Sequence, residues 1–231
     1  MSQLPTEPLS LAGHEIVPST SVRDLGVFID ADLTMHQFVS VIVSRCFAAL
    51  RQLRAVRRYV SASVMHSLVT SLILTRLDYC NSVLFGLPAT QIRRLQAVQN
   101  AAARLVFGIR RSEHISDALI SMHWLRVTER IRFKIAVMVY KSLHGSSPSY
   151  LTSFVPCSSA SGRTGLRSAA SHRLLVPRCR FSTVGARSFL VAGANVWNGL
   201  SSHVVSAPSL TVFRSRLRTF LFSFSYCGAI I

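Results

Sequence analysis

The sequence predicts a mainly α-helical protein, with a short β-hairpin at its N-terminal end and a loosely ordered C-terminal segment of helices and short strands. Apolar residues recur at helical spacing over most of the chain, which is the primary sign of amphipathic helices. Hydrophobic residues make up 49% of the 231 residues and charged residues 15%, so the chain can bury a core and is not disordered by composition. Strand signals are short and lie beside turn residues.

Residues 1–35 form the predicted β element. The strand candidates are Leu9–Leu11, Glu15–Val17 and Val22–Ile29. Asp30 and Asp32 follow the last of these strands and precede a helix, where aspartate commonly serves turns and helix caps. We prefer that structural role to a pair of metal-binding carboxylates, and we assign no catalytic residue.

Residues 36–145 have the pattern of a bundle of four or five helices. The first helix, His36–Tyr59, carries an apolar stripe, while arginines gather toward its C-terminal end. Positive charge at that end favours the helix dipole, and it is also where a basic helix would meet a nucleic-acid backbone. The residues alone leave a solvated basic face and a nucleic-acid contact as alternatives.

The stretch Ser71–Gly108 contains two predicted helices around a break at Gly86-Leu87-Pro88, because proline disfavours helix at the residue before it. We expect Thr90 to cap the second helix and Gly108 to end it. The second helix is half basic. Its predicted polar face consists of Arg93, Arg94, Gln96, Gln99, Asn100 and Arg104.

Two further helices are expected before residue 145. Ser116 is placed to cap a short helix, and a longer helix runs from Glu129 to His144. Asp78, in the apolar helix before the proline break, has no facing partner on its own helix. We expect it to pair with an arginine of a neighbouring helix, such as Arg51 or Arg104.

Residues 146–172 are rich in Ser, Gly and Pro and have the composition of a linker or ordered loop, which makes them the best domain boundary. Residues 173–231 form a basic C-terminal segment. Its expected strands are Leu174–Pro177 and Cys179–Ser182, and its expected helices are Ala186–Asn198 and Leu210–Phe222. Ser209 is placed to cap the last helix.

The chain is strongly basic, with 26 Lys and Arg against 9 Asp and Glu and a net charge of +17. Arginine supplies nearly all of this charge, since the only lysines are Lys134 and Lys141. Residues 1–35 carry −4, so the remainder carries +21. The planar guanidinium group suits phosphate oxygens and stacks on bases, so the composition points to a polyanionic partner. GC-biased codon usage is the alternative explanation of the arginine content.

No cofactor, metal or membrane site is predicted. The five cysteines, at positions 46, 80, 157, 179 and 227, lack metal-ligand spacing and indicate free thiols in a reducing compartment. His114, His123 and His144 have no cysteine or carboxylate partner at ligand spacing. No segment reaches the ~20 apolar residues of a spanning helix and no signal peptide is present, so we expect an intracellular protein, nuclear or cytoplasmic.

Six blocks of sequence follow one another in a specific order between Arg76 and Phe222, within a resemblance that covers roughly residues 9 to 222. They are RLDYCNSVLFGLP with RLQAVQNAAARLVFG, HWLRVTERIRFKIAVMVYKSLHG, PSYL, LVPRCRFSTVG, VWNGL and SLTVFRSRLRTFLF. Together they resemble the region after the palm in the reverse transcriptases of LINE-type (non-LTR) retrotransposons. RDLGVFID, at Arg23–Asp30, resembles the strand that closes the palm and grips the primer end. The resemblance implies that the catalytic carboxylates lie upstream, in a palm missing from this chain.

The resemblance implies a thumb-like bundle over residues 36–145 and a primer-grip-like remnant over residues 1–35. We therefore expect a catalytically incomplete fragment of an RNA-directed DNA polymerase, with nucleic acid and the missing palm domain as its partners. Binding would neutralise an RNA–DNA or DNA backbone without reading its sequence. The expected contacts are Arg51, Arg54, Arg57, Arg58, Arg93, Arg94, Arg104, Arg110 and Arg111, with Arg214, Arg216 and Arg218 as a second patch. The alternative is a translated remnant of a transposable element with no selected activity.

Overall fold

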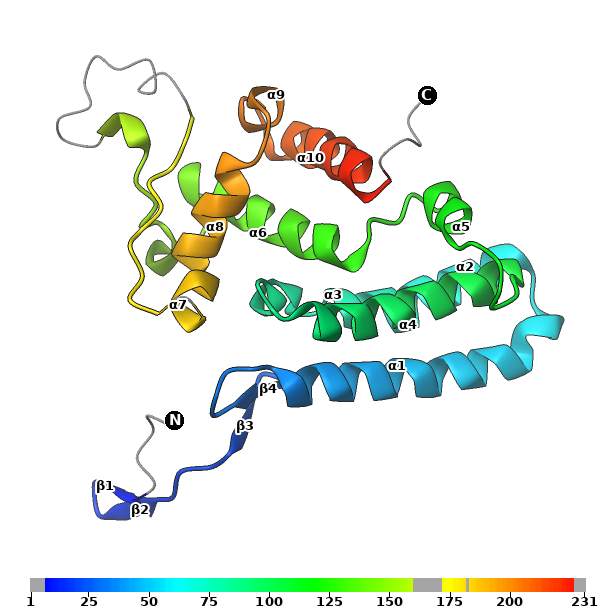
Figure 1. Cartoon of the computed structure of the whole chain (residues 1–231), viewed down its shortest axis with the longest axis horizontal. Helices are drawn as coiled ribbons and strands as arrows, with labels where there is room; N and C mark the ends of the chain where they lie inside the picture. The colour runs from blue at the N-terminus through cyan, green and yellow to red at the C-terminus, as the bar shows by residue number, and fades with distance from the viewer. Residues whose placement is uncertain (1–6, 160–171, 182, 227–231) are drawn as a thin grey trace.

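The structure, a computed structural model, describes residues 7–159, 172–181 and 183–226, and it confirms the mainly helical fold. The helices stack in layers, seen edge-on in Figure 1. α1 forms one side of the stack, α2 to α4 lie next to it, α6 and α8 follow, and α10 closes the far side. Two small hairpins project from the N-terminal end of α1.

The N-terminal segment forms two antiparallel hairpins where we expected one hairpin and a further strand. The strands are β1 (Leu9–Leu11), β2 (His14–Ile16), β3 (Ser21–Asp24) and β4 (Val27–Asp30). The expected strand Val22–Ile29 is split by a two-residue turn at Leu25 and Gly26, whose φ angles are 44° and 85°. Two positive φ angles match the right-handed twist of a tight hairpin, and glycine at the second position adopts one without steric cost.

The first helices agree with the prediction. α1 spans His36–Val56 and continues as the 3₁₀ turn η1 (Arg57–Tyr59). An apolar helix follows, made of α2 (Ala62–Val69), the π-helical turn η2 (Thr70–Leu74) and α3 (Thr75–Asp78). Ser61 caps it, because its Oγ accepts a hydrogen bond from the Val64 backbone N–H at 3.3 Å.

The proline break is present, although the predicted cap after it is wrong. The 3₁₀ turn η3 (Asn81–Leu84) precedes α4, which runs from Ala89 to Phe107. Pro88 holds the N-cap position, so Thr90 lies one residue inside the helix and caps nothing. Gly108 adopts a φ of 70° and ends α4 as expected.

The remaining elements match in type but less well in their ends. They are α5 (Ser116–Ser121), α6 (Val127–Leu143), η4 (Ser149–Leu151), η5 (Cys157–Ser159), α7 (Val184–Arg187), α8 (Phe189–Asn198), α9 (Ser202–Val205) and α10 (Leu210–Ser225). Ser116 lies inside α5 and does not cap it, whereas Ser209 caps α10 as predicted. The expected strand pair after residue 173 is wrong, because Leu174 forms an isolated bridge with Pro156; Ser182 lies outside the described residues.

One continuous core runs through the stacked helices. Val39 of α1, Val98 of α4, Ile135 of α6 and Phe213 of α10 all have side chains closed to solvent. Trp197 of α8 is buried in this core. Its Nε1 donates a hydrogen bond to the His172 carbonyl oxygen at 2.8 Å, which satisfies the polar end of the indole.

The predicted polar face of α4 is wrong at Gln99, whose side chain is fully buried. Gln99 Nε2 donates to the Leu125 carbonyl oxygen at 2.8 Å. Gln96 Nε2 donates to Gln99 Oε1 at 2.9 Å, and Gln96 Oε1 accepts from the Val127 backbone N–H at 2.9 Å. The two glutamines thereby connect α4 to the start of α6 with their buried polar groups satisfied.

Asp78 pairs with an arginine of a neighbouring helix, as expected, but that residue is Arg130 of α6 and not Arg51 or Arg104. Arg130 Nε donates to Asp78 Oδ1 at 2.8 Å, and its Nη2 contacts Oδ2 in the second half of a two-pronged ion pair. Asn81 Nδ2 donates to the same Oδ1 at 3.3 Å. The pair ties the end of α3 to α6.

Candidate nucleic-acid interface

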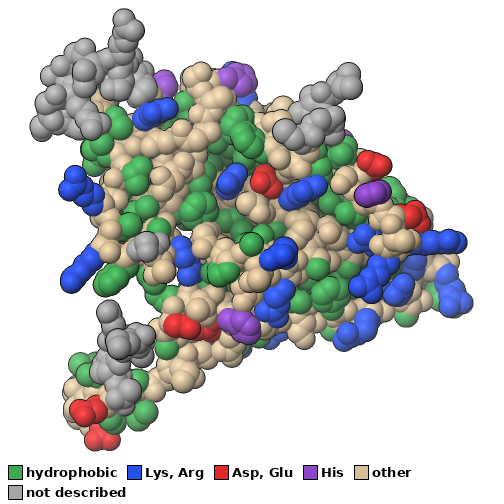
Figure 2. Space-filling model, viewed as in Figure 1, with side chains coloured by type: hydrophobic (Ala, Val, Ile, Leu, Met, Phe, Trp, Pro, Cys, Tyr) green, Lys and Arg blue, Asp and Glu red, His purple; other side chains and the backbone are tan. Residues whose placement is uncertain are grey.

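A groove of about 710 Å³ lies between α1 and α4, toward the C-terminal ends of both helices. We call it the arginine groove. Its arginines are Arg51, Arg54, Arg57, Arg104 and Arg111, five of the twelve that we expected to contact nucleic acid. None of the described residues that line it is acidic. Figure 2 shows Lys and Arg side chains gathered at this end of the molecule.

Helical spacing produces the groove. On α1, Phe47, Leu50, Arg51 and Arg54 are three or four residues apart, so they share one face. On α4, Ala97, Ala101, Arg104 and Leu105 repeat in the same way, and the C-cap residue Gly108 follows them. Apart from Asn100, the residues that line the groove beside the arginines are small or apolar.

Two of the groove arginines, Arg57 and Arg104, donate hydrogen bonds to backbone carbonyl oxygens of the protein. Arg57 Nε donates to the Leu105 carbonyl oxygen at 2.7 Å, and its Nη2 donates to that of Val106 at 3.0 Å. These carbonyls belong to the last turn of α4, which has no helical partners for them. Arg104 Nη2 reaches the carbonyl oxygens of Arg111 and Glu113, at 3.5 and 3.3 Å, and holds the loop after α4.

The other three groove arginines are available to a ligand. Arg51, Arg54 and Arg111 are exposed, and within the described residues their guanidinium groups make no hydrogen bond or ion pair. An unpaired guanidinium offers up to five N–H donors to phosphate oxygens. These three side chains are therefore the strongest candidates for backbone contact.

The remaining predicted arginines of the helical bundle lie outside the groove. Arg58 and Arg110 are exposed and are close to it in sequence. Arg93 and Arg94 lie in the first two turns of α4, away from the groove end of that helix. Arg94 is committed to protein contacts, since it donates to Gln91 Oε1 and to Ser40 Oγ, both at 3.0 Å.

The second predicted patch is on a different side of the molecule. Arg214, Arg216 and Arg218 lie on α10, at the far side of the stack from α1 (Figure 1). Arg216 Nη1 donates to the His203 carbonyl oxygen at 2.8 Å and so connects α10 to the α9 region. Arg214 and Arg218 are exposed. The structure does not bring this patch together with the arginine groove.

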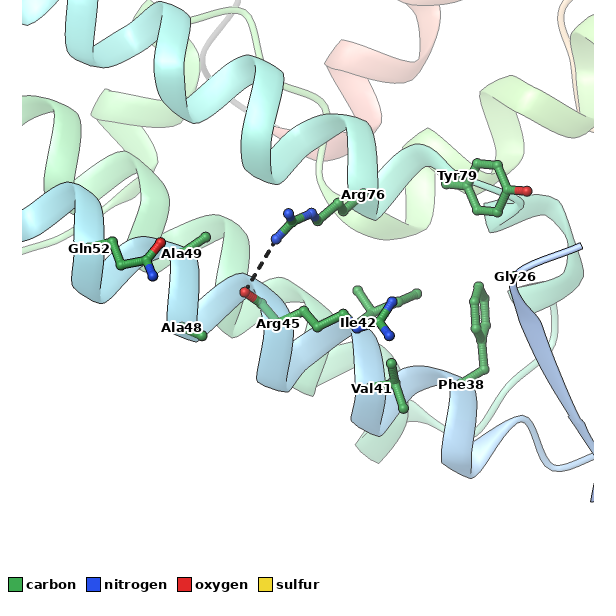
Figure 3. A pocket seen from close by; sticks show the side chains of 10 residues that line it. All are labelled: Gly26, Phe38, Val41, Ile42, Arg45, Ala48, Ala49, Gln52, Arg76 and Tyr79. Atoms are coloured by element: carbon green, nitrogen blue, oxygen red, sulfur yellow. Dashed lines mark hydrogen bonds between the residues drawn. The ribbon is translucent and has the colours of Figure 1, made fainter. Parts of the chain in front are cut away.

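The prediction missed a second arginine-bearing cavity, of about 460 Å³, on the opposite face of α1 (Figure 3). Arg45 of α1, Arg76 of α3 and Tyr79 are among the residues that line it. The helical angle of Arg45 already separates it from Arg51 and Arg54, because six and nine residues correspond to about 240° and 180° of rotation at 3.6 residues per turn. The sequence does not show that Arg76 and Tyr79 face Arg45 across this cavity.

Asp30 and Asp32 have the structural role that we preferred for them. Asp30 Oδ2 accepts from Thr34 Oγ1 at 3.0 Å and from the Gln37 backbone N–H at 3.4 Å, beside the start of α1. Asp32 Oδ1 accepts from the Thr34 backbone N–H at 3.2 Å. That backbone hydrogen bond lowers the pKa of Asp32. Asp30 is the last residue of β4 and Asp32 lies in the turn before α1, and both carboxylates accept hydrogen bonds from Thr34 of that turn.

In the described part of the chain, His, Cys, Asp and Glu residues nowhere gather in the groups of three that a metal ion needs. None of the described helices is long and apolar enough to cross a membrane. Comparison of the chain with protein-family models, with curated proteins and with solved structures finds no match in any of the three. The resemblance to reverse transcriptases therefore stays a prediction from the sequence.

Proposed function

We propose that this chain is a nucleic-acid-binding helical module, related to the post-palm region of a LINE-type reverse transcriptase and without polymerase activity of its own. The arginine groove carries the proposal. Five arginines converge there from α1, η1, α4 and the following loop, and the described lining contains no carboxylate to neutralise them. Such a surface suits the phosphate backbone of RNA or DNA.

The groove is suited to neutralising phosphates and not to recognising base sequence. Arg51, Arg54 and Arg111 present guanidinium groups that can neutralise phosphates, which releases condensed counterions and makes affinity depend on salt. Apart from the arginines and Asn100, the described lining residues are small or apolar and offer few hydrogen bonds to base edges. Binding through such contacts positions a strand without selecting its sequence.

Absence of polymerase activity is part of the proposal. Palm polymerases hold two metal ions between paired carboxylates. In the N-terminal segment, Asp30 and Asp32 are bonded to Thr34 and to the start of α1, where they organise a turn. This local use of both carboxylates supports the part of the proposal that gives them no role in holding catalytic metal ions.

The test is a salt titration of binding to an RNA–DNA duplex, measured by fluorescence anisotropy. Arg51→Ala with Arg54→Ala should weaken binding about tenfold at low salt and reduce the slope of log K against log salt by about 2. The matched control is Arg178→Ala with Arg180→Ala, which removes the same charge from exposed positions outside the groove. The control should change affinity and slope much less.

Equal losses in the two double variants would mean that net charge, and not the groove, attracts the duplex. Binding by the unaltered chain that does not respond to salt, or no binding at all, would reject the proposed function. The last result would favour the alternative of a translated remnant with no selected activity.

A further inference from the structure

α1 lies between two cavities that contain arginines. Its Phe47–Arg54 face lines the arginine groove, and its opposite face lines the cavity of about 460 Å³ beside α3 and the β3–β4 turn (Figure 3). We propose that this second cavity binds one nucleotide, with the base against Tyr79 and the phosphate between Arg45 and Arg76. We call it the Tyr79 cavity.

Tyr79 provides a fixed aromatic face. Its side chain is 51% exposed, although its hydroxyl donates to the Leu25 carbonyl oxygen at 2.5 Å. That hydrogen bond holds the ring against the β3–β4 turn without covering it. The turn approaches closely, since a Cβ added to Gly26 would lie 3.7 Å from the ring. A ring held in place in this way can stack on a base with little loss of conformational freedom.

Arg45 and Arg76 provide the positive charge. Figure 3 shows Arg76 extending from α3 toward α1, where Arg45 lies. Arg76 Nη1 donates to the Arg45 carbonyl oxygen at 3.4 Å, a long hydrogen bond that leaves most of its donors unused. The Arg45 guanidinium makes no hydrogen bond within the described residues, and both side chains are exposed. The described lining contains no carboxylate to compete with a phosphate.

The rest of the lining fits a planar ligand of limited size. Apolar and small side chains form most of the α1 wall, and they are Phe38, Val41, Ile42, Ala48 and Ala49. Gln52 adds an amide that can bond to a base edge. The volume of about 460 Å³ is within the roughly 300–1,000 Å³ range of small-ligand sites. An aromatic face, an apolar wall and two arginines in one lining together favour a nucleotide over a bare anion.

The nucleotide could come from two sources: a free nucleotide in solution, or one residue of a single strand. The chemistry of recognition is the same in both. The Tyr79 cavity shares no lining residue with the arginine groove, so its occupancy does not depend on the function proposed for that groove.

The test uses the full chain, with AMP and single-stranded oligoadenylate as separate probes, measured by calorimetry. Tyr79→Leu removes the aromatic face and should weaken binding of the occupying probe about tenfold. Tyr79→Phe keeps the ring and loses the bond to Leu25, so its binding should stay within about threefold. Arg45→Gln with Arg76→Gln should weaken binding at least tenfold, because both phosphate partners are removed.

Two matched controls change the same residue types elsewhere. Tyr150→Leu alters an exposed tyrosine outside the cavity, and Arg51→Gln with Arg54→Gln alters the arginine groove. With AMP, both should bind like the unaltered chain. The site is supported if Tyr79→Leu weakens binding of either probe and Tyr150→Leu does not. The probe whose binding is weakened identifies the source of the nucleotide. The proposal is overturned if neither probe binds, if inorganic phosphate competes as well as AMP, or if Tyr79→Leu and Tyr150→Leu behave alike.

Discussion

Arg57 and Arg54 are three residues apart and both face the arginine groove, yet their guanidinium groups have different surroundings. Arg57 is bonded to the carbonyl oxygens of Leu105 and Val106, while Arg54 has no such partner among the described residues. The sequence shows two equivalent arginines on one helix face. Only the position of α4 decides which of them stabilises the protein and which can bind a ligand.

At the Asp78–Arg130 ion pair, we expect Asp78→Ala to lower the free energy of unfolding by about 1–3 kcal/mol. The substitution leaves the partly buried Arg130 guanidinium and Asn81 Nδ2 without their shared acceptor. Urea denaturation followed by circular dichroism measures the change. Asp24→Ala, an exposed aspartate without such a pair, is the control and should change stability by less than about 0.5 kcal/mol. Equal effects of the two substitutions would contradict the role of the pair.

Cys46 should make stability depend on alkaline pH. Burial raises the pKa of its thiol from 9.0 to about 11, although the charge of Arg76 lowers it in part. Between these values the unfolded chain has lost the thiol proton and the folded chain has kept it. Raising the pH therefore favours unfolding, by about 2 kcal/mol between pH 8 and 10.5.

The measurement is urea unfolding at several pH values, for the unaltered chain and for Cys46→Ala. The variant should lose this part of the alkaline destabilisation. Burial also raises the pKa of Tyr226 to about 12, and that effect has the same sign but should be equal in both proteins. Parallel pH profiles for the two proteins would show that Cys46 does not ionise on unfolding in this range.

At the scale of elements, the C-terminal end of α4 depends on η1. Arg57→Ala removes two hydrogen bonds to last-turn carbonyls and a positive charge near the negative end of the helix dipole. We expect a loss of about 1–2 kcal/mol in the free energy of unfolding. Arg54→Ala should leave stability nearly unchanged while weakening nucleic-acid binding. If Arg54→Ala destabilises the protein as much as Arg57→Ala, the division of roles between them is wrong.

The helices could be predicted from the sequence because their signals are local. The apolar stripe of α1, the proline break before α4 and the Gly108 stop each depend on residues within a few positions of one another. The second hairpin was missed because Val22–Ile29 reads as one strand until the positive φ angles at its centre are known. Local pattern identifies an element better than it identifies its interruptions.

What could not be predicted depends on residues far apart in the chain. The helical spacing puts Gln99 on the polar face of α4, but the carbonyl oxygen of Leu125 supplies a buried partner 26 residues away. Asp78 finds Arg130 across 52 residues. The sequence predicts each groove arginine of α1 and α4 as a nucleic-acid contact. It does not predict that these arginines converge or that the Tyr79 cavity exists, because both depend on how the helices pack.

Across the molecule, the net negative charge and the net positive charge lie in different parts of the chain. The first 35 residues carry −4 and the remainder +21, and the acidic part contains the two hairpins. The two hairpins are not equivalent. All six strand residues of β1 and β2 are exposed, whereas β4 buries Val27 and the turn before it is bonded to Tyr79. Only the second hairpin is therefore integrated with the helical body.

This difference predicts the outcome of two truncations. Removing residues 1–17 should change the thermal midpoint of the helical body by less than about 2 °C, because all residues of the deleted strands are exposed and their removal breaks no buried contact. Removing residues 1–34 also deletes Val27 and the Leu25 carbonyl, uncovering apolar side chains of α1 and freeing the Tyr79 ring. That chain should melt at least about 5 °C lower, and it should also lose binding at the Tyr79 cavity. Circular dichroism melts of the unaltered chain and the two truncations measure the shifts. A large shift on removing residues 1–17 alone would mean that the first hairpin packs on the helices.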